Sequence, residues 1–400
     1  MRRPGGPGPA GARTGAAGAR RVPPLPPGSD AATPPHLAPG AAGAPRRAPR
    51  PSRHTALRGG DVSLADLFLR HLCQTSASPL GLTVARASGS TIWDTTGRAY
   101  LDLLAGMGVA NVGHTHPEVV AAVTAQAARH LHVMVYGELV QEAQVRLAAR
   151  LADLLGPPLD VVYFTCSGAE AIEGAMKTAR KYTGRRRLVA FEGGFHGDTL
   201  GALSIGGNPL YRVPFEPLLP DVGWLPFDDP AALAAIDDAT AAVIVEPVQA
   251  EAGVRIPSPG FLPALRRRCD ETGALLVLDE VVTGFGRTGR LFAHQDAGVV
   301  PDLLVLAKAL GGGLPLGAFV GRREVMDTLS HDPPLAHVTT FGGHPLSCAA
   351  GLAALDILLR DDLPARAAAL GEELRSALEA LVGHGGLVVV RGRGLLLGLE

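Results

Sequence analysis

The sequence predicts an α/β protein built around a mostly parallel β-sheet. From about residue 115, short continuous apolar runs alternate with segments of helical periodicity. Apolar residues at every position of a run indicate a strand that is buried on both faces, as in parallel sheets. Polar residues follow most of these runs directly, and the carboxyl ends of parallel strands are where such sheets bind ligands.

The elements are expected in the following order. "DVSLADLFLRHL", from Asp61, has the apolar spacing of a helix, and "TIWDTTGRAYLDLLAG" alternates like a β-hairpin with its turn at residues 94–97. Long amphipathic helices are predicted in "PEVVAAVTAQAARHLHV" and "ELVQEAQVRLAARLADLL". The predicted strands are "VVYF", "RLVAF", "AAVIVE", "ALLVLDE" and "LLVLA".

Composition narrows the class of protein. The chain has 400 residues, 46% of them hydrophobic, and a mean hydropathy of +0.19, which suits a large core and two domains. No apolar run approaches the roughly 20 residues that cross a bilayer, so we expect no membrane partner. The four cysteines form no CxxC pair and are expected to be reduced core thiols in a cytoplasmic protein.

Residues 1–60 differ from the rest in charge and composition. They contain ten arginines, no lysine and one acid, Asp30, among many Pro, Gly and Ala residues. Such a segment buries too little apolar surface to fold, so disorder is expected. A functionless extension or misassigned start is favoured over an organelle transit peptide and over an arm that binds nucleic acid or a membrane surface. We therefore expect no nucleic-acid partner.

Lysine is rare, and one lysine is unusually placed. The sequence holds three, Lys177, Lys181 and Lys308, and every other basic residue is arginine. Lys308 lies in the apolar stretch "LLVLAKALGGGLPLGAF". Burial disfavours an ammonium, and a neutral amine condenses with an aldehyde, which arginine cannot do because it stays protonated. The alternative is a lysine that extends from a strand end into solvent.

Polar residues that could bind a ligand also lie at or near the ends of two other predicted strands. Ser167 and Glu170 have capping-box spacing; they form either a simple helix cap or, with the N–H groups of Gly168 and Ala169, a phosphate site. Asp279 ends a buried strand, where it either caps the next loop or pairs with a cationic ring nitrogen.

Four further polar or aromatic groups follow the second and third predicted strands. Phe195 and His196 lie where a planar ligand would stack, unless they only pack the loop, and Glu246 and Glu251 follow the third strand. An amine for an aldehyde, a phosphate site, a stacking aromatic and a carboxylate for a pyridinium nitrogen together indicate pyridoxal phosphate.

Two other motifs are weak. Residues 284–289 match GxGxxG, but no crossover helix follows before Pro301, which argues against a nicotinamide site. His114 and His116 form an HxH pair without a third ligand at a suitable spacing, so no metal site is expected.

From about residue 80 onward the chain resembles the class III pyridoxal-phosphate aminotransferases, such as the ornithine, acetylornithine and 4-aminobutyrate aminotransferases. The resemblance is carried by "GMGVANVGHTHPEV", "FTCSGAEAIEGAMKTAR", "EPVQAEAGV", "VLDEVVTGFGRTGRLF", "PDLLVLAKALGGGLPLGA", "TTFGGHPLSCAAGLAAL" and "VRGRGLLLGLE". It implies a fold type I enzyme, with a large domain around a mostly parallel sheet and a smaller α+β domain. The implied domains are an extension at 1–60, an N-terminal segment at 61–112, a cofactor domain at 113–345 and a C-terminal small domain at 346–400.

The resemblance also assigns roles to residues. Lys308 is similar to the lysine that forms the Schiff base with the cofactor and later moves the proton in a ping-pong reaction, and Asp279 resembles the partner of the ring nitrogen. Thr340 resembles a threonine that reaches the phosphate of the neighbouring subunit, which implies a homodimer with shared sites. The implied cofactor-binding residues are Ser167, Gly168, Ala169, Phe195, His196, Asp279, Val282, Lys308 and Thr340, and the implied substrate-binding residues are Arg391 and Glu251, with Glu246 structural.

The chain departs from the family pattern at three places. Val282 stands where the family often has Gln, and Asp198 stands where ornithine-type members have an arginine for a second carboxylate. "FHGDT" is similar to "YHGDT" of diaminopelargonate aminotransferases. The chain stops at Glu400, so we expect the small domain to be incomplete. The expected function is transfer of an amino group, often a terminal one, from an amino acid or diamine to a 2-oxo acid. The alternatives are a diaminopelargonate-type or other ω-aminotransferase, isomerisation or decarboxylation on the same lysine, and a non-catalytic homologue.

Overall fold

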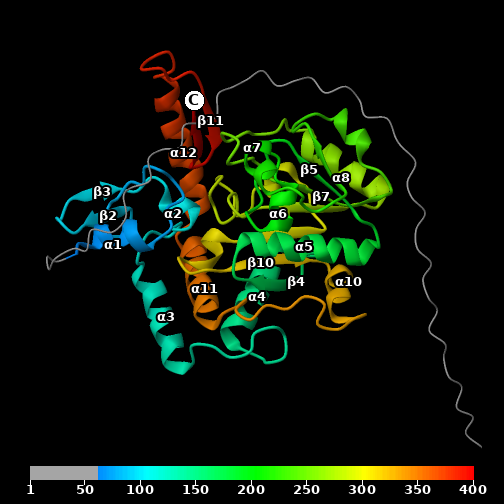
Figure 1. The fold of residues 1–400 in the computed structure, drawn as a ribbon, viewed down its shortest axis with the longest axis horizontal. Coiled ribbons are helices and arrows are strands. Elements are labelled where there is room, and N and C mark those ends of the chain that lie inside the picture. The colour runs from blue at the N-terminus through cyan, green and yellow to red at the C-terminus, as the bar shows by residue number, and fades with distance from the viewer. Residues whose placement is uncertain (1–61) are drawn as a thin grey trace, which may run out of the picture. The chain divides into compact units, whose positions relative to one another are not determined.

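A seven-stranded sheet lies at the centre of residues 62–400, the part of the chain that the computed structural model describes (Figure 1). The strand order is β4-β10-β9-β8-β7-β5-β6. Neighbouring strands from β9 through β8, β7 and β5 to β6 are parallel, whereas β10 is antiparallel to both β4 and β9. The prediction of a mostly parallel sheet is confirmed. The strands are β4 (Val161–Thr165), β5 (Arg187–Phe191), β6 (Val222–Leu225), β7 (Thr240–Val245), β8 (Leu275–Asp279), β9 (Leu303–Leu306) and β10 (Gly317–Gly321).

Two of these strands were not predicted from the sequence. β6 is a four-residue strand at the edge of the sheet, and its apolar run is too short to stand out. β10 begins and ends with glycine and follows the glycine-rich turn after Lys308, so its apolar residues merge with that turn in the sequence. All five residues of β10 are nevertheless buried, because this strand lies between β4 and β9.

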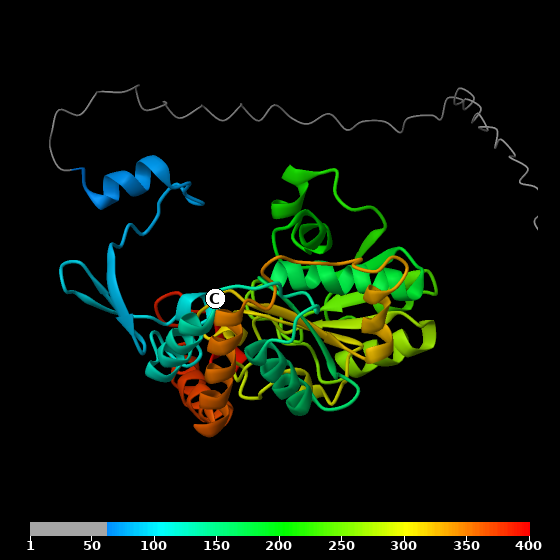
Figure 2. The ribbon, with the colours of Figure 1, turned by 90° about the horizontal axis from the view of Figure 1, so that it is seen from below.

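Helices cover both faces of the sheet, giving three layers (Figure 2). Alternate residues of each strand point to opposite faces. In β5, Val189 packs in the cluster with helices α4, α8 and α11, whereas Leu188 packs in the cluster with α5 and α6. These helices are α4 (Glu142–Leu155), α5 (Gly168–Thr183), α6 (Leu200–Ile205), α8 (Phe261–Thr272) and α11 (Pro345–Arg360). The expected helix from residue 138 begins four residues later, at Glu142.

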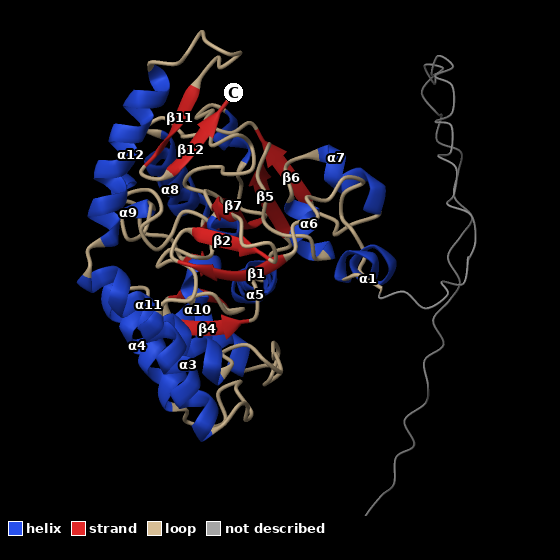
Figure 3. Cartoon of the chain, turned by 90° about the vertical axis from the view of Figure 1, so that its left-hand side faces the viewer, coloured by secondary structure: helices blue, strands red, loops and turns tan. Residues whose placement is uncertain are grey.

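The elements before β4 and after α11 are smaller units. Three antiparallel strands include the predicted hairpin, whose turn is closed by the Gly97 N–H donating to the Asp94 carbonyl at 3.0 Å. Two antiparallel strands, β11 and β12, follow the long helix α12 (Figure 3). The bounds are α1 (Leu64–His71), β1 (Val84–Ser88), β2 (Thr91–Asp94), β3 (Ala99–Leu101), α2 (Ala105–Gly108), α3 (Pro117–Arg129), α7 (Pro209–Arg212), α9 (His294–Ala297), α10 (Arg323–Met326), α12 (Leu363–Glu379), β11 (Val390–Arg393) and β12 (Leu396–Leu399).

Other expectations met mixed outcomes. Cys269 and Cys348 are buried, but Cys73 is exposed and Cys166 is partly exposed, so the expectation of four core thiols is wrong for these two. Within residues 62–400 no helix has both the length and the apolar character to span a bilayer. The predictions for the arginine-rich extension at 1–60 lie outside the described residues, and the domain boundaries at 112/113 and 345/346 stay predictions.

Candidate active site

Lys308 lies at the point where β9 ends and a 3₁₀ turn, Lys308–Gly311, begins. Its backbone has φ of 49°, a left-handed conformation that is uncommon for residues other than glycine and is concentrated at functional sites. The side chain lines a cavity of about 420 Å³ together with residues that follow β4, β5, β7 and β8. The predicted residues in this lining are Ser167, Gly168, Ala169, Phe195, His196, Glu246, Asp279, Val282 and Lys308.

The N-terminus of α5 forms one wall of the cavity. Ser167 caps the helix, because its hydroxyl accepts the Glu170 N–H at 3.2 Å. The Glu170 carboxylate accepts the Cys166 N–H at 2.7 Å. In the expected capping box it would accept the N–H of Ser167, so the observed bond is shifted by one residue toward the N-terminus. The first-turn N–H groups of a helix have no intrahelical acceptor and suit an anion. A Cβ on Gly168 would lie 2.9 Å from Val281 Cγ2, so a larger residue does not fit there.

Asp279 is held from two sides at the end of β8. Its Oδ2 lies 2.7 Å from His196 Nδ1, and its Oδ1 accepts the Val281 N–H at 3.0 Å. Both side chains of the pair are buried. Burial opposes a charge on His196, but the hydrogen bond and charge of Asp279, with Glu246 nearby, raise the pKa of His196 above its usual range. His196 therefore lies behind Asp279 and holds its carboxylate in place, a role that the sequence did not indicate.

Glu246 fixes the loop that carries Phe195. One carboxylate oxygen accepts the Phe195 N–H at 3.0 Å and the other accepts the Ala250 N–H at 3.1 Å. Burial and the charge of Asp279 raise the pKa of Glu246 to about 7, against the attraction of His196. Phe195 itself is partly exposed at the cavity wall, where its ring is available to a planar ligand.

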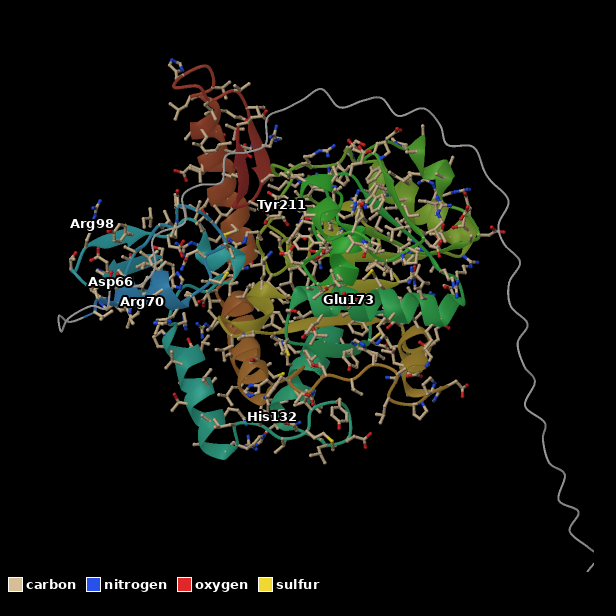
Figure 4. The ribbon with its side chains drawn as sticks, in the orientation of Figure 1. Asp66, Arg70, Arg98, His132, Glu173 and Tyr211 are labelled. Carbon is tan, nitrogen blue, oxygen red and sulfur yellow. The ribbon has the colours of Figure 1, made fainter. Side chains whose placement is uncertain are left out.

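Glu173 is a supporting residue that the sequence did not identify. It projects from α5 (Figure 4), and its Oε1 accepts the Thr199 hydroxyl at 2.7 Å and the Ala202 N–H at 3.2 Å. These bonds connect the start of α6 to α5, whose N-terminus forms one wall of the cavity. The segment from Phe195 to Thr199 is therefore anchored at both ends, by Glu246 and by Glu173.

Three predicted residues do not line this cavity. Thr340 is exposed on the loop before α11. Arg391 Nε donates to the Gly253 carbonyl at 2.8 Å, and its Nη2 forms an ion pair with Glu400 at 2.7 Å. Glu251 is exposed on the same loop as Gly253. Arg391 and this loop are thus neighbours, as a pair that controls a substrate carboxylate requires, but their substrate role stays a prediction.

The cavity also contains residues that gave little signal in the sequence. Val109, which directly follows α2, and Leu314 and Pro315, in the turn before β10, supply apolar wall. Cys166 lies between β4 and Ser167, and burial raises the pKa of its thiol. The two histidines of the HxH motif have structural contacts, because His116 caps α3 and His114 lies 2.6 Å from Asp102.

Comparison with protein families identifies the chain. Residues 73–400 match the family model described as aminotransferase class-III. The chain belongs to the class III aminotransferases. This confirms the predicted family, the α/β fold and a pyridoxal-phosphate-dependent transaminase, and it gives no support to a non-catalytic homologue.

Named relatives agree with this family. An acetylornithine aminotransferase of Methanopyrus kandleri is 47% identical over 80% of this chain and 80% of its own length. A putrescine aminotransferase of Pectobacterium atrosepticum is 45% identical over 82% of this chain and 72% of its own. The crystal structure of an ornithine aminotransferase from Toxoplasma gondii has a TM-score of 0.78 and 34% identity, covering 83% of this chain and 80% of that one.

The residues present fit the family's cofactor. The α5 N-terminus offers N–H donors for a phosphate, and the space beside Gly168 is closed to any larger side chain. Asp279 offers a carboxylate for a protonated ring nitrogen, and Lys308 offers the amine. All these groups line one cavity, whose volume of about 420 Å³ is typical of small-molecule sites.

The Glu246→Gln variant tests the electrostatics of this site. The pKa of Glu246 is higher in the folded protein than in the unfolded chain, where it is near 4.5. The stability that this difference contributes is fully present below pH 4.5, and it is lost as the pH rises through about 7. The neutral amide has no such dependence. Between pH 5 and pH 8 the cofactor-free wild type should therefore lose on the order of 2 kcal/mol relative to the variant. Denaturant unfolding at several pH values measures this, and parallel pH profiles for the two proteins would contradict it.

Proposed function

We propose that this aminotransferase takes its amino group from the terminal amine of an N-acetylornithine- or ornithine-like donor and passes it to a 2-oxo acid. The support is the convergence of Lys308, Asp279 and the α5 N-terminus on one cavity, together with the acetylornithine aminotransferases among the relatives. Arg391 lies beside the loop that carries Glu251. An arginine there can bind the carboxylate of an amino acid, and this loop can cover that arginine when the terminal amine of the donor enters the site. These neighbouring positions therefore favour an amino acid donor.

The chain's own residues account for the chemistry as follows. When bound, pyridoxal phosphate supplies an aldehyde for amines and a ring that stores electrons. Lys308 Nζ accepts a proton from the donor's reacting carbon and returns it later, as a positioned base and acid. Asp279, held by His196 and the Val281 N–H, stabilises a positive charge on the ring nitrogen. Val109, Val282 and Leu314 exclude water from the reacting atoms.

We propose that the enzyme is a homodimer whose subunits share their active sites. Helix α1 has no buried residue, and several of its leucines are exposed, with Leu64 at 66% and Leu69 at 60%. Such an apolar surface on a described element favours a protein partner. Thr340 is exposed and does not line the cavity of its own chain, which suits a residue that reaches the cofactor phosphate of the partner subunit.

Subunit mixing tests the shared site. Lys308→Ala should be inactive and Thr340→Val should be impaired, about tenfold for one lost hydrogen bond to a phosphate. A mixed dimer contains one site with both native residues, so unfolding and refolding the two variants together should restore activity above the average of the two preparations. Light scattering gives the molar mass of each preparation. A monomeric mass, or activities that only average, would rule out sharing.

A diamine such as putrescine is a second candidate donor. Asp198 is exposed next to Gly197, which lines the cavity, and a carboxylate there attracts a distal ammonium and repels a distal carboxylate. The putrescine aminotransferase among the relatives supports the same possibility. A diaminopelargonate-type donor is the remaining alternative, on the strength of the "FHGDT" sequence.

A donor panel decides among these candidates. N-acetylornithine, ornithine, putrescine and diaminopelargonate are each offered with 2-oxoglutarate or pyruvate, and the new amino acid is quantified. We expect the highest kcat/KM for N-acetylornithine, and we expect Asp198→Asn to lower kcat/KM for putrescine alone. Failure of all donors with all acceptors would refute aminotransfer, and reaction without any oxo acid would point to isomerisation or decarboxylation.

We also propose a cytoplasmic location. The four cysteines are unpaired, as is usual in a reducing compartment. Cell fractionation of the full chain would test this.

A further inference from the structure

A second pocket, of about 450 Å³, lies at the C-terminal end of α5, the helix whose N-terminus forms one wall of the active-site cavity. The 16 residues of α5 place the two ends of the helix roughly 24 Å apart. Five of the eight lining residues are basic and none is acidic; we call this the basic pocket. It is lined by Lys177, Arg180, Lys181, Gly184, Arg185, Arg186, Leu329 and Ala336.

The five cations of the basic pocket lack ion pairs. In residues 62–400, no carboxylate oxygen lies within 4.0 Å of any of them, whereas the next residue, Arg187, pairs with Asp237 at 2.8 Å. Four of the five donate to carbonyl groups instead; Arg185 Nη1, for example, donates to the Thr240 carbonyl at 3.0 Å and to the Thr272 carbonyl at 2.9 Å. Carbonyl groups satisfy hydrogen bonds but do not neutralise charge, so the positive charges act on one another.

Arg180 carries the clearest sign of this imbalance. Its Nε is buried and has no hydrogen-bond partner among the described residues. Burial and the nearby charge of Arg186 lower the pKa of Arg180, and the attraction of Asp221 does not offset them. Like charges around a partly buried guanidinium are costly to a protein unless an anion lies nearby.

The helix end alone does not explain this cluster. The negative end of the α5 dipole accounts for basic residues in the last turn, here Arg180 and Lys181. Lys177 lies a turn earlier, with Nζ 3.0 Å from His337 Nδ1, and Arg185 and Arg186 lie beyond the helix. Two of the three lysines of the chain thus lie here, one turn apart on the same face of α5.

We propose that the basic pocket binds a small anion that carries phosphate groups. Guanidinium groups match the oxygens of a phosphate in pairs, and lysines add mobile donors. The pocket volume is in the range of small-molecule sites. The site is separate from the cofactor phosphate site, because the two are at opposite ends of α5.

Pyrophosphate is the probe for this proposal. The full chain is first saturated with pyridoxal phosphate, so that the N-terminal end of α5 is filled, and pyrophosphate is titrated by calorimetry at constant ionic strength. Arg186→Glu reverses the charge of an exposed pocket residue. The matched control is Arg267→Glu, an exposed arginine of α8 without an ion pair among the described residues. Arg186→Glu should weaken pyrophosphate binding about tenfold or more, and Arg267→Glu should leave it unchanged.

Three results would overturn the proposal. The first is equal weakening by Arg186→Glu and Arg267→Glu, which indicates general screening of charge. The second is binding of pyrophosphate no tighter than that of chloride. The third is that a DNA oligonucleotide or anionic vesicles bind more tightly than pyrophosphate with the same dependence on Arg186, which would assign the surface to a macromolecule. Lys177→Gln, measured beside its own melting temperature, repeats the test at a second position.

Discussion

Lys308→Arg is expected to lower kcat for aminotransfer by about 10⁴-fold or more. The substitution keeps a long, positively charged side chain at the end of β9, so packing and net charge change little. A guanidinium stays protonated at neutral pH, and it neither condenses with an aldehyde nor accepts a proton from carbon. Single-turnover product formation and the visible absorbance of bound cofactor report the two losses separately.

The chain offers a matched control for this substitution. Lys181→Arg makes the same chemical change at the other end of α5, away from the cavity of Lys308, and should keep the wild-type rate. Lys308→Ala adds a check on proton transfer, because small primary amines added to the buffer should partly restore the rate. Equal activities of the Lys308→Arg and Lys181→Arg proteins would disprove the role of Lys308.

Asp279→Asn is expected to lower kcat by about 10²–10³-fold, as when one electrostatic stabiliser is removed from an active site. The amide has nearly the same shape but no negative charge to hold a protonated ring nitrogen. It also leaves the buried His196 without its ionised partner, and because that partner raises the pKa of His196, the imidazole should become neutral. Steady-state kinetics and cofactor titration measure the effect.

A surface aspartate provides the comparison for Asp279. Asp153 is exposed on α4 and its side chain has no hydrogen bond or ion pair within the described chain, so Asp153→Asn should behave as wild type. The melting temperature of cofactor-free Asp279→Asn separates a folding defect from a catalytic one. An Asp279→Asn enzyme that bound cofactor and turned over at the wild-type rate would remove the carboxylate from the mechanism.

The sheet and its ligand-binding edge were predictable from local patterns. Continuous apolar runs identify strands that are buried on both faces, and this succeeded for five of the seven strands of the sheet. It failed for β10, because glycine at both ends hides a strand whose burial depends on its two neighbours. Asp279 and Ser167 were predictable as candidate site residues because Asp279 ends one such run and Ser167 follows another within three residues.

The contacts that organise the site were less accessible from the sequence. His196 and Asp279 are 83 residues apart, and nothing local distinguishes a histidine that stacks on a ligand from one that bonds to a carboxylate. Glu173 resembles any solvent-facing glutamate of an amphipathic helix until α6 lies against it. The position of the Arg391 side chain depends on the approach of β11 to the loop at Gly253, which is not visible in the sequence.

The sequence by itself was enough to predict the chemistry of this protein, from one lysine in an apolar stretch, where arginine could not form a Schiff base, and from polar groups at the ends of parallel strands. These are properties of residue types and of local order along the chain, so they need no coordinates. The tertiary structure decided which groups support that chemistry, namely His196 behind Asp279 and Glu246 and Glu173 on the loop of Phe195. Packing between distant segments of the chain brings those partners into contact, so the contacts form only when the layers of the fold assemble.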